Sequence, residues 1–585
     1  MHRSCPSAIL TTILVLALSA CSPDAPPPEA ATAVAVATAQ EFVDGYYHQF
    51  PEEAFEIAYP DTPMDQLGDR SQAAMDDWRA KEDGWLRALR GINPDIVEGT
   101  ASAIPLAFAL DRLEASEVRR VCRTELWNVS PTSNGWQAKL SSTVASQPVT
   151  TAQERDDALA RLLSVSDYLD REMENLRIGM RLGYLAPQSN VVAVLRQLDA
   201  LLGGDPESSP FYSPASRAGD DSFAAQVHSA VAESINPAIA RYRAFLTDEY
   251  VGRDEVGVGF NPDGEACYAA SVRFHTSLPL DATGIHETGL TEMEQIQSQM
   301  AAIALASFDT EDVAGLLERF RSDKQYTFRS EDEILAYARA AVERAAVGVH
   351  DWFGFVPEAE LVVQPFPAYQ KATGGGYYSA GSLDGSRPGT YELGTYRPET
   401  LSKAGLEATA FHESYPGHHL QMAVALKGKG VHPVLRYIYV AAMAEGWGLY
   451  TELLADEMGL YSSDLDRMGM LSNQALRAAR LVVDPGMHVL GWTRDQAIAY
   501  MLANTAETRS TVESEVDRYL ATPGQATAYM TGSMEIQRLR VDAEERLGSR
   551  FDVKGFHDTV LADGAVSLPM LQEAVNRWVL ARSGG

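Results

Sequence analysis

Apolar residues recur at three- and four-residue spacing over much of the chain, which is the pattern of helices with one buried face. The pattern is clear in four stretches, residues 154–183, 290–307, 330–354 and 402–480. Ser330 is the first residue of one of them and Glu333 follows three residues later, a spacing typical of a capping box. The sequence therefore predicts a mainly α protein.

One stretch, residues 368–400, departs from this pattern. It contains three consecutive glycines, two adjacent tyrosines, an Asp-Gly pair and the alternating segment TYELGTY, which together predict a β-hairpin or a short sheet. The stretch directly precedes the helix that carries His412. An exposed strand edge can pair with the extended backbone of a bound peptide. We expect such an edge here, with a hairpin on the surface as the alternative.

The chain shows no internal repeat of 20–50 residues, which argues against a solenoid. No Pro- or Ser-rich linker interrupts residues 40–575. We therefore expect residues 40–580 to form one large helical domain built around a cleft.

The N-terminus has the pattern of an export signal. Arg3 precedes an apolar run, residues 8–18, that is too short to span a bilayer as a helix, and small residues follow it. The segment Leu-Ser-Ala-Cys at 18–21 resembles a bacterial lipoprotein signal, which implies removal of residues 1–20 and lipid attachment to Cys21. An ordinary signal peptide with an incidental cysteine is the alternative.

Ser22, in place of the aspartate of an inner-membrane retention signal, favours the outer membrane by the same resemblance. Residues 21–39 are rich in Pro and Ala, and we expect them to form a flexible tether. The prediction is a lipoprotein of the bacterial cell envelope that faces the periplasm and is held to the membrane by Cys21.

The net charge of the chain argues against one class of partner, nucleic acid. The chain has 48 Lys and Arg against 80 Asp and Glu, which gives a net charge of −32. Because such a surface repels phosphate backbones, we expect no nucleic acid partner.

Two cysteines remain that could form a disulfide. If the signal is removed and Cys21 is acylated, the remaining thiols are Cys122 and Cys267. In an oxidising compartment we predict a disulfide between them, with two separately buried free cysteines as the alternative. No C-x-x-C motif is present, so the sequence indicates neither a zinc ribbon nor a thioredoxin-like site.

The segment AFHESYPGHHLQ, residues 410–421, begins like the zinc-protease motif H-E-x-x-H. In that motif two histidines on one helix face bind zinc, and the glutamate acts as general base. Here position 416 is a proline, and the next histidines are His418 and His419. On a regular helix His412 and His418 would point about 120° apart, and His419 would lie about 10.5 Å along the axis from His412.

The Pro416-Gly417 pair provides a way to bring two of these histidines together. Proline removes a helical hydrogen bond and glycine permits unusual dihedral angles. A break or bulge over residues 414–417 would return His418 to the position that the second histidine of the motif occupies. Whether His418 or His419 is the second ligand stays open from the sequence.

A third ligand is expected on the segment AEGWGLYTELLADEMG, residues 444–459. It provides Glu445, and the small Gly446 and Gly448 would let that helix lie close to the metal-binding helix. Glu452 shares the face of Glu445, so it is either a substitute ligand or a carboxylate that supports the ligands. The alternative for each is a solvated charge.

Other histidines lack partners in the sequence. His286 is followed by a glutamate, but no second histidine occurs within the next seven residues, so we assign it no metal. The same holds for His275, His350 and His432.

Several separated blocks are similar to the bacterial domain of unknown function 885 family: GIHETGLTEMEQIQSQM, SLDGSRPG, FHESYPGHHLQ, AEGWGLYTELLADEMG, LVVDPGMHVLGWTRDQAIAYM and FHDTVLADGAVSLPML. This family is placed near the Glu-zincin metallopeptidases, whose helical members have a two-lobed, zincin-like fold. The resemblance implies a peptidase that uses Zn²⁺, hydrolyses a peptide substrate and has a large helical two-lobed fold.

Site roles also follow from that resemblance. It implies His412, His418 and Glu445 as metal ligands and Glu413 as general base. Because related peptidases stabilise the oxyanion with a tyrosine and often a histidine from the C-terminal lobe, it implies Tyr529 first and His488 second as catalytic groups. His557 is a further candidate, and a tyrosine bonded to backbone is the ordinary alternative.

Three arginines, Arg477, Arg480 and Arg540, are candidates for binding a substrate carboxylate, with surface charge as the alternative. Two other functions remain open from the sequence. One is a non-catalytic envelope lipoprotein or binding module that keeps the fold, and the other is a zinc hydrolase of non-peptide amides or esters.

Overall fold

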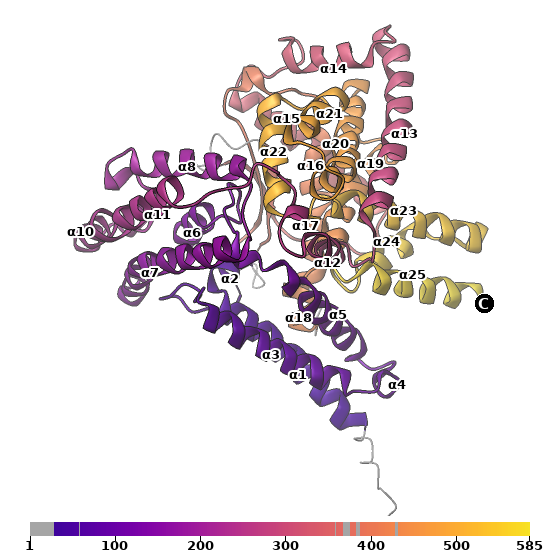
Figure 1. The fold of residues 1–585 in the computed structure, drawn as a ribbon. Coiled ribbons are helices and arrows are strands. Elements are labelled where there is room, and N and C mark those ends of the chain that lie inside the picture. Colours follow the sequence, from indigo (N-terminus) through magenta and orange to yellow (C-terminus); the bar gives the residue numbers. More distant parts are fainter. Residues whose placement is uncertain are drawn as a thin grey trace, which may run out of the picture.

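The computed structural model describes residues 28–57, 59–356, 358–366, 375–381, 387–427 and 431–584. It confirms a mainly helical protein with a small three-stranded sheet (Figure 1). None of the helices in these ranges is long and apolar enough to span a bilayer.

The first helices pack against one another and form the indigo arm at the bottom of Figure 1: α1 (Pro28–Gln49), α2 (Pro51–Ile57), α3 (Gln72–Arg90), α4 (Pro94–Val97) and α5 (Ala103–Arg119). Ala31, Ala35 and Ala39 recur every four residues and are buried, because their small side chains let α1 pack closely on α3 and α5. The predicted tether, residues 21–39, is therefore wrong over residues 28–39. Residues 1–27, with Cys21 and the export signal, lie outside the described residues.

A second group of helices has its own hydrophobic core and projects to the left in Figure 1: α6 (Trp136–Ser146), α7 (Ala152–Leu182), α8 (Gln188–Leu202), α9 (Ser213–Ala218), α10 (Asp221–Ala230) and α11 (Asn236–Asp248). Trp136 meets Tyr242 edge-on in this core, with ring centroids 5.3 Å apart. The helix predicted over residues 154–183 is α7.

The next helices are α12 (Gly264–Thr276), α13 (Ala282–Phe308), α14 (Val313–Ser322) and α15 (Glu331–Gly348). A disulfide between Cys122 and Cys267 joins the short turn η1 (Arg120–Cys122) to α12, with Cα atoms 4.6 Å apart. The predicted disulfide is confirmed, and the alternative of two free thiols is wrong.

Only half of the predicted capping box at α15 forms. Ser330 accepts a hydrogen bond from the backbone N–H of Glu333, whereas the Glu333 carboxylate accepts from the backbone N–H of Arg329 rather than from that of Ser330.

The sheet has the strand order β1-β3-β2, formed by β1 (Leu361–Pro365), β2 (Gly376–Ser379) and β3 (Gly389–Leu393). β2 and β3 are antiparallel, which confirms the predicted hairpin or short sheet, although the Asp-Gly pair at 384–385 lies outside the described residues. The sequence did not indicate β1, because its five residues precede the segment with turn signals and pair in parallel with β3.

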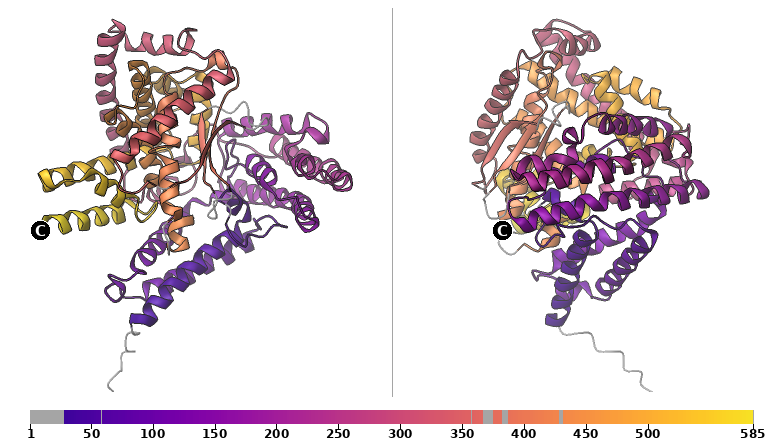
Figure 2. Two further views of the ribbon diagram at one scale, coloured as in Figure 1. Left: turned by 180° about the vertical axis from the view of Figure 1, so that it is seen from behind. Right: turned by 90° about the vertical axis from the view of Figure 1, so that its left-hand side faces the viewer.

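The C-terminal half supplies α16 (Leu406–Glu413), α17 (His418–Lys427), α18 (Pro433–Tyr437), α19 (Ala441–Glu457), α20 (Asp464–His488), α21 (Arg494–Asn504), α22 (Arg509–Ala521), α23 (Ala528–Leu547), α24 (Val553–Leu561) and α25 (Leu568–Ser583). The long helical region 402–480 is thus divided into several helices. α20 packs along α13, and α19 packs on both α16 and α23 (Figure 2). Contacts among α16, α19 and α20 place these three helices side by side, and α16 also packs on β2 of the sheet.

Candidate metal centre and cleft

The HESYPGHH segment is divided between two helices, with the predicted break between them. α16 ends at Glu413 and α17 starts at His418. The backbone N–H of Gly417 bonds to the carbonyl of Phe411 at 3.1 Å. A Cβ at Gly417 would lie 1.9 Å from the carbonyl oxygen of His412, so only glycine fits this reversal. The predicted break over residues 414–417 is confirmed.

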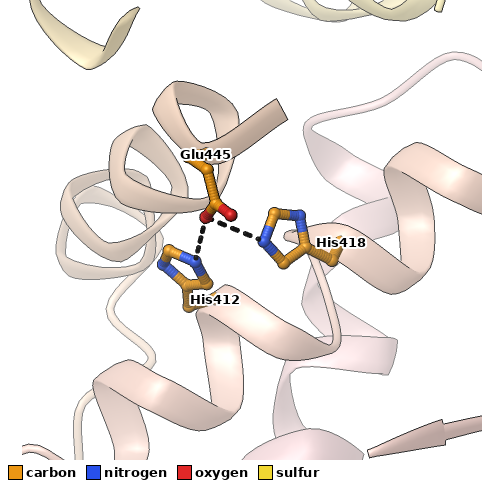
Figure 3. Close-up of side chains that lie close together, drawn as sticks. All are labelled: His412, His418 and Glu445. Carbon is orange, nitrogen blue, oxygen red and sulfur yellow. Dashed lines mark ion pairs between the residues drawn. The ribbon is translucent and has the colours of Figure 1, made fainter. Parts of the chain in front are cut away.

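The break brings two imidazoles together with a carboxylate. His412 and His418 have ring centroids 4.8 Å apart and nearly perpendicular ring planes. Oε2 of Glu445, from α19, lies 3.7 Å from Nε2 of His412 and 3.6 Å from Nε2 of His418 (Figure 3). One ligand atom from each residue lies within 4.8 Å of the other two.

The opposite nitrogen of each imidazole is bonded to a different side chain. Nδ1 of His412 lies 2.9 Å from Oε1 of Glu452, and Nδ1 of His418 lies 3.2 Å from Oε1 of Gln421. Because these oxygens can accept a hydrogen bond from Nδ1–H, Nε2 is the nitrogen that each ring can offer to a metal ion beside Glu445. Ligand histidines in metalloproteins are oriented in this way.

This arrangement fits a zinc ion. Tetrahedral ligands about 2.1 Å from zinc lie about 3.4 Å apart, so the two separations between Glu445 and the imidazoles need to contract by only a few tenths of an ångström. Two imidazoles and one carboxylate are the ligands of catalytic zinc sites that keep a fourth position for water or substrate.

The electrostatics of the cluster favour positive charge. Burial opposes a charge on His412, but hydrogen bonds to Glu445 and Glu452 outweigh it and raise the pKa of this imidazole to about 9. Burial likewise opposes the charge of Glu445, yet the two imidazoles lower the pKa of its carboxyl group. The cluster therefore has a net preference for a cation beside the carboxylate.

The two glycines of α19 have separate packing roles. A Cβ at Gly448 would lie 2.6 Å from Nε2 of His412, so this glycine gives the ligand ring its space, as expected. A Cβ at Gly446 would instead meet the backbone of Gly532 on α23 at 2.5 Å. The expectation that Gly446 admits the metal-binding helix is wrong, because it serves the contact between α19 and α23.

His419 points away from the cluster. Its Nδ1 lies 3.0 Å from the hydroxyl of Tyr378 on β2, and its Nε2 lies 3.0 Å from the hydroxyl of Tyr415. The geometry therefore selects His418 as the second imidazole. Glu452 is not a third ligand but the partner of His412. The sequence analysis missed Gln421, although its position three residues after His418 on a helix was a usable signal.

A cleft of about 1790 Å³ opens beside the cluster, and Glu413 and Tyr529 line it together with the three candidate ligands. The Tyr529 ring lies under the guanidinium of Arg480, 4.4 Å from its centroid. Burial, followed by the negative charge of Glu445, raises the pKa of Tyr529, so its hydroxyl remains protonated. The structure thus brings Tyr529 and Glu413 to the site.

The two histidines considered as oxyanion donors lie elsewhere. His488 is buried in the core, where Nδ1 accepts from the N–H of Val258 and Nε2 bonds to the carbonyl of Tyr519. His557 is buried between the carbonyl of Trp352 and the hydroxyl of Tyr450. The expectation for His488 is wrong because both ring nitrogens are occupied within the core and the side chain does not reach the cleft.

Two further side chains have partners outside the candidate metal centre. His286 lies near the start of α13, as expected for a helix-start histidine, with Nδ1 2.8 Å from the carbonyl of Val482. Arg540 is paired with Glu457 and Glu544 away from the cleft, so it is not a substrate-binding group.

Comparisons with known proteins agree with the fold. A family model described as "Bacterial protein of unknown function (DUF885)" matches residues 51–575. The chain is similar to the crystal structure of a candidate lipoprotein from Colwellia psychrerythraea, with a TM-score of 0.85 and 25% identity over 95% of this chain and 99% of that one. It also resembles a candidate lipoprotein of unknown function from Shewanella oneidensis, with a TM-score of 0.70 and 17% identity over 92% and 98% of the two chains. No curated protein matches this sequence.

Proposed function

This chain belongs to the bacterial DUF885 family of unknown function, and we propose that it is a zinc-dependent peptidase of the cell envelope. The observation that carries the proposal is the convergence of His412, His418 and Glu445 from three helices, α16, α17 and α19, with Glu413 beside them in a large cleft. Part of the proposal is a relation to helical two-lobed zinc peptidases, which rests on the motif around His412.

His412, His418 and Glu445 would hold the ion, and Glu452 and Gln421 would orient the two imidazoles. Zinc bound at these ligands would supply a Lewis acid that makes a water molecule nucleophilic and polarises the substrate carbonyl.

Glu413 handles the proton in this proposal. It is the last residue of α16, directly after the ligand His412, and it lines the cleft where substrate must enter. Its carboxylate accepts a proton from the attacking water and then delivers it to the leaving amine. Tyr529, which stays protonated, donates a hydrogen bond to the carbonyl oxygen as negative charge develops there.

An extended peptide has a backbone partner in β2. This strand is at the edge of the sheet, and residues 375–381 line the cleft. Tyr377 on this strand is 56% exposed. We expect the outer edge of β2 to pair with substrate backbone, which holds peptides of any sequence.

The envelope location is proposed from the lipoprotein-like segment that ends at Cys21 and from the description of both similar structures as candidate lipoproteins. Cys21→Ser should move the protein from the membrane fraction to the soluble fraction. If the parent protein is itself soluble and the variant fractionates identically, the lipid anchor is wrong.

The peptidase proposal is tested by zinc content and peptide hydrolysis of the purified protein. Glu413→Gln should keep about one zinc per chain and lose hydrolysis, because it removes the base and spares the ligands. His418→Ala should lose both, whereas the neighbouring control His419→Ala should keep the zinc.

The remaining outcomes of these experiments would favour one of the two alternative functions. Zinc without cleavage of any peptide would favour a hydrolase of other amides or of esters. Absence of zinc in the purified protein, with no uptake on addition, would contradict the proposal and favour a non-catalytic envelope lipoprotein.

A further inference from the structure

One face of α20 carries a row of hydrogen-bond donors along the cleft wall. Asn473, Arg477 and Arg480 follow one another at spacings of four and three residues, so their side chains lie on the same side of the helix. All three line the cleft that contains the candidate metal centre. Amide and guanidinium groups at adjacent turns form a surface that can bind an acceptor with several oxygens.

Each of these side chains has a buried nitrogen without an acceptor among the described residues. These atoms are Nδ2 of Asn473, Nε of Arg477 and Nη1 of Arg480. Asn473 is 8% exposed and Arg480 is 6% exposed. Because buried donors in folded proteins are nearly always bonded, unmatched donors on successive turns indicate an acceptor that comes from outside the chain.

Guanidinium groups are concentrated at this face. The guanidinium groups of Arg480 and Arg518 share one carboxylate, Glu515, while Arg477 and Arg480 act together on the half-buried Glu507. Arg321, from α14, also acts on Glu507 and is paired with Glu318. In a chain with a net charge of −32, three arginines thus line this part of the cleft, Arg321, Arg477 and Arg480, and guanidinium groups are the natural partners of a carboxylate.

The donor row lies next to the candidate metal centre. Oε1 of Glu452 is 2.9 Å from Nδ1 of His412 and 3.9 Å from Nη2 of Arg477. A single carboxylate thus separates the guanidinium from the ligand imidazole. Arg477 and the candidate ligands line the same cleft, so an anion bound by Arg477 and a carbonyl group held at the cluster can belong to one substrate molecule.

We propose that this face of α20 binds the free α-carboxylate at the C-terminus of a peptide substrate, so that the enzyme shortens peptides from that end. Arg477 makes the main contact, because its planar guanidinium matches the two oxygens of a carboxylate, and Asn473 and Arg480 provide the flanking donors. The inference rests on the proposed peptidase function and assigns its substrate class.

The first experiment needs no variant. A mixture of N-acetylated decapeptides with varied last residues is prepared once with free C-termini and once with C-terminal amides, and products are followed by mass spectrometry. We expect a ladder shortened from the C-terminus for the free acids, and cleavage of the amides slower by about 10- to 100-fold, since a charged hydrogen-bond pair is lost. Equal cleavage of both forms, or cuts at internal bonds, would overturn the proposal while leaving the peptidase function intact.

The second experiment measures binding apart from catalysis. In Glu413→Gln protein, we expect the free-acid decapeptides to bind at least about tenfold more tightly than the amides by calorimetry, and addition of Arg477→Gln to abolish this difference. Arg467→Gln is the matched control, because Arg467 lies on the same helix but pairs with Asp456 at the surface, with 41% of its side chain exposed.

The binding result separates the two proposals. Preferential binding of free acids without hydrolysis by the parent protein would support the carboxylate site and contradict the peptidase. Equal affinity for acids and amides, or a preference that Arg477→Gln leaves unchanged, would overturn the assignment of α20.

Discussion

Replacement of Glu452 by glutamine tests whether the candidate metal centre depends on its supporting carboxylate. Oε1 of Glu452 lies 2.9 Å from Nδ1 of His412, and its side chain is completely buried. Glutamine keeps the size of the side chain but removes the negative charge that fixes the ring and strengthens Nε2 as a ligand. We therefore expect a weaker metal site in a protein that still folds.

The expected magnitude follows from this contact. Loss of a partner behind a metal-binding histidine costs about 10- to 100-fold in metal affinity, which corresponds to about 1.4–2.7 kcal/mol. Because water does not reach the Glu452 side chain, its charge is poorly screened and the effect should lie near the upper end.

Zinc affinity is measured by competition with a chromophoric chelator, and the fold of the metal-free protein is checked by circular dichroism. Glu457→Gln is the control, because Glu457 lies on the same helix but is 46% exposed and pairs with Arg540. An affinity of Glu452→Gln within about twofold of the parent, with the fold intact, would refute the reasoning.

Three further predictions follow from other contacts. Gly448→Ala should abolish zinc binding, because its Cβ would lie 2.6 Å from Nε2 of His412, and elemental analysis checks this; full zinc content would contradict it. Cys122→Ser opens a disulfide whose cysteines are 145 residues apart, so urea titration should show a loss of up to about 5 kcal/mol in the free energy of unfolding. Burial lowers the pKa of His488 to about 3 and that of His557 to about 4, from 6.5. The unfolded state then binds these protons first, so the free energy of unfolding should decrease as the pH falls from about 6.5 toward 4, and a constant value over that range would contradict the assignment.

The sequence by itself determined features that depend on neighbouring residues. Periodic apolar positions indicated the helices of residues 154–183 and 290–307, because a helix buries one face whatever it packs against. The break at residues 416–417 was also predictable from local sequence, since proline and glycine act on their own backbone. The hairpin of β2 and β3 followed from local turn and strand signals.

Only the tertiary structure decided which side chains meet. His418 and His419 are adjacent in sequence, yet the exit of the chain from the break directs one to Glu445 and the other to Tyr378. His488, a plausible donor in the sequence, lies in the core because α20 packs along its length. Such outcomes depend on contacts between segments far apart in the chain, which no local pattern encodes.

The helical start of α1 and the donor row on α20 both depend on packing by segments that are distant in the sequence. Residues 28–39 have the composition of a linker, but their alanines are helical because α3 and α5 provide a surface to pack against. Arg477 and Arg480 resemble surface charges in the sequence, and they become a candidate binding face only where neighbouring helices bury them beside a cleft. A polar side chain needs a hydrogen-bond partner once distant segments bury it, and which side chains are buried in this way is decided only when the chain folds.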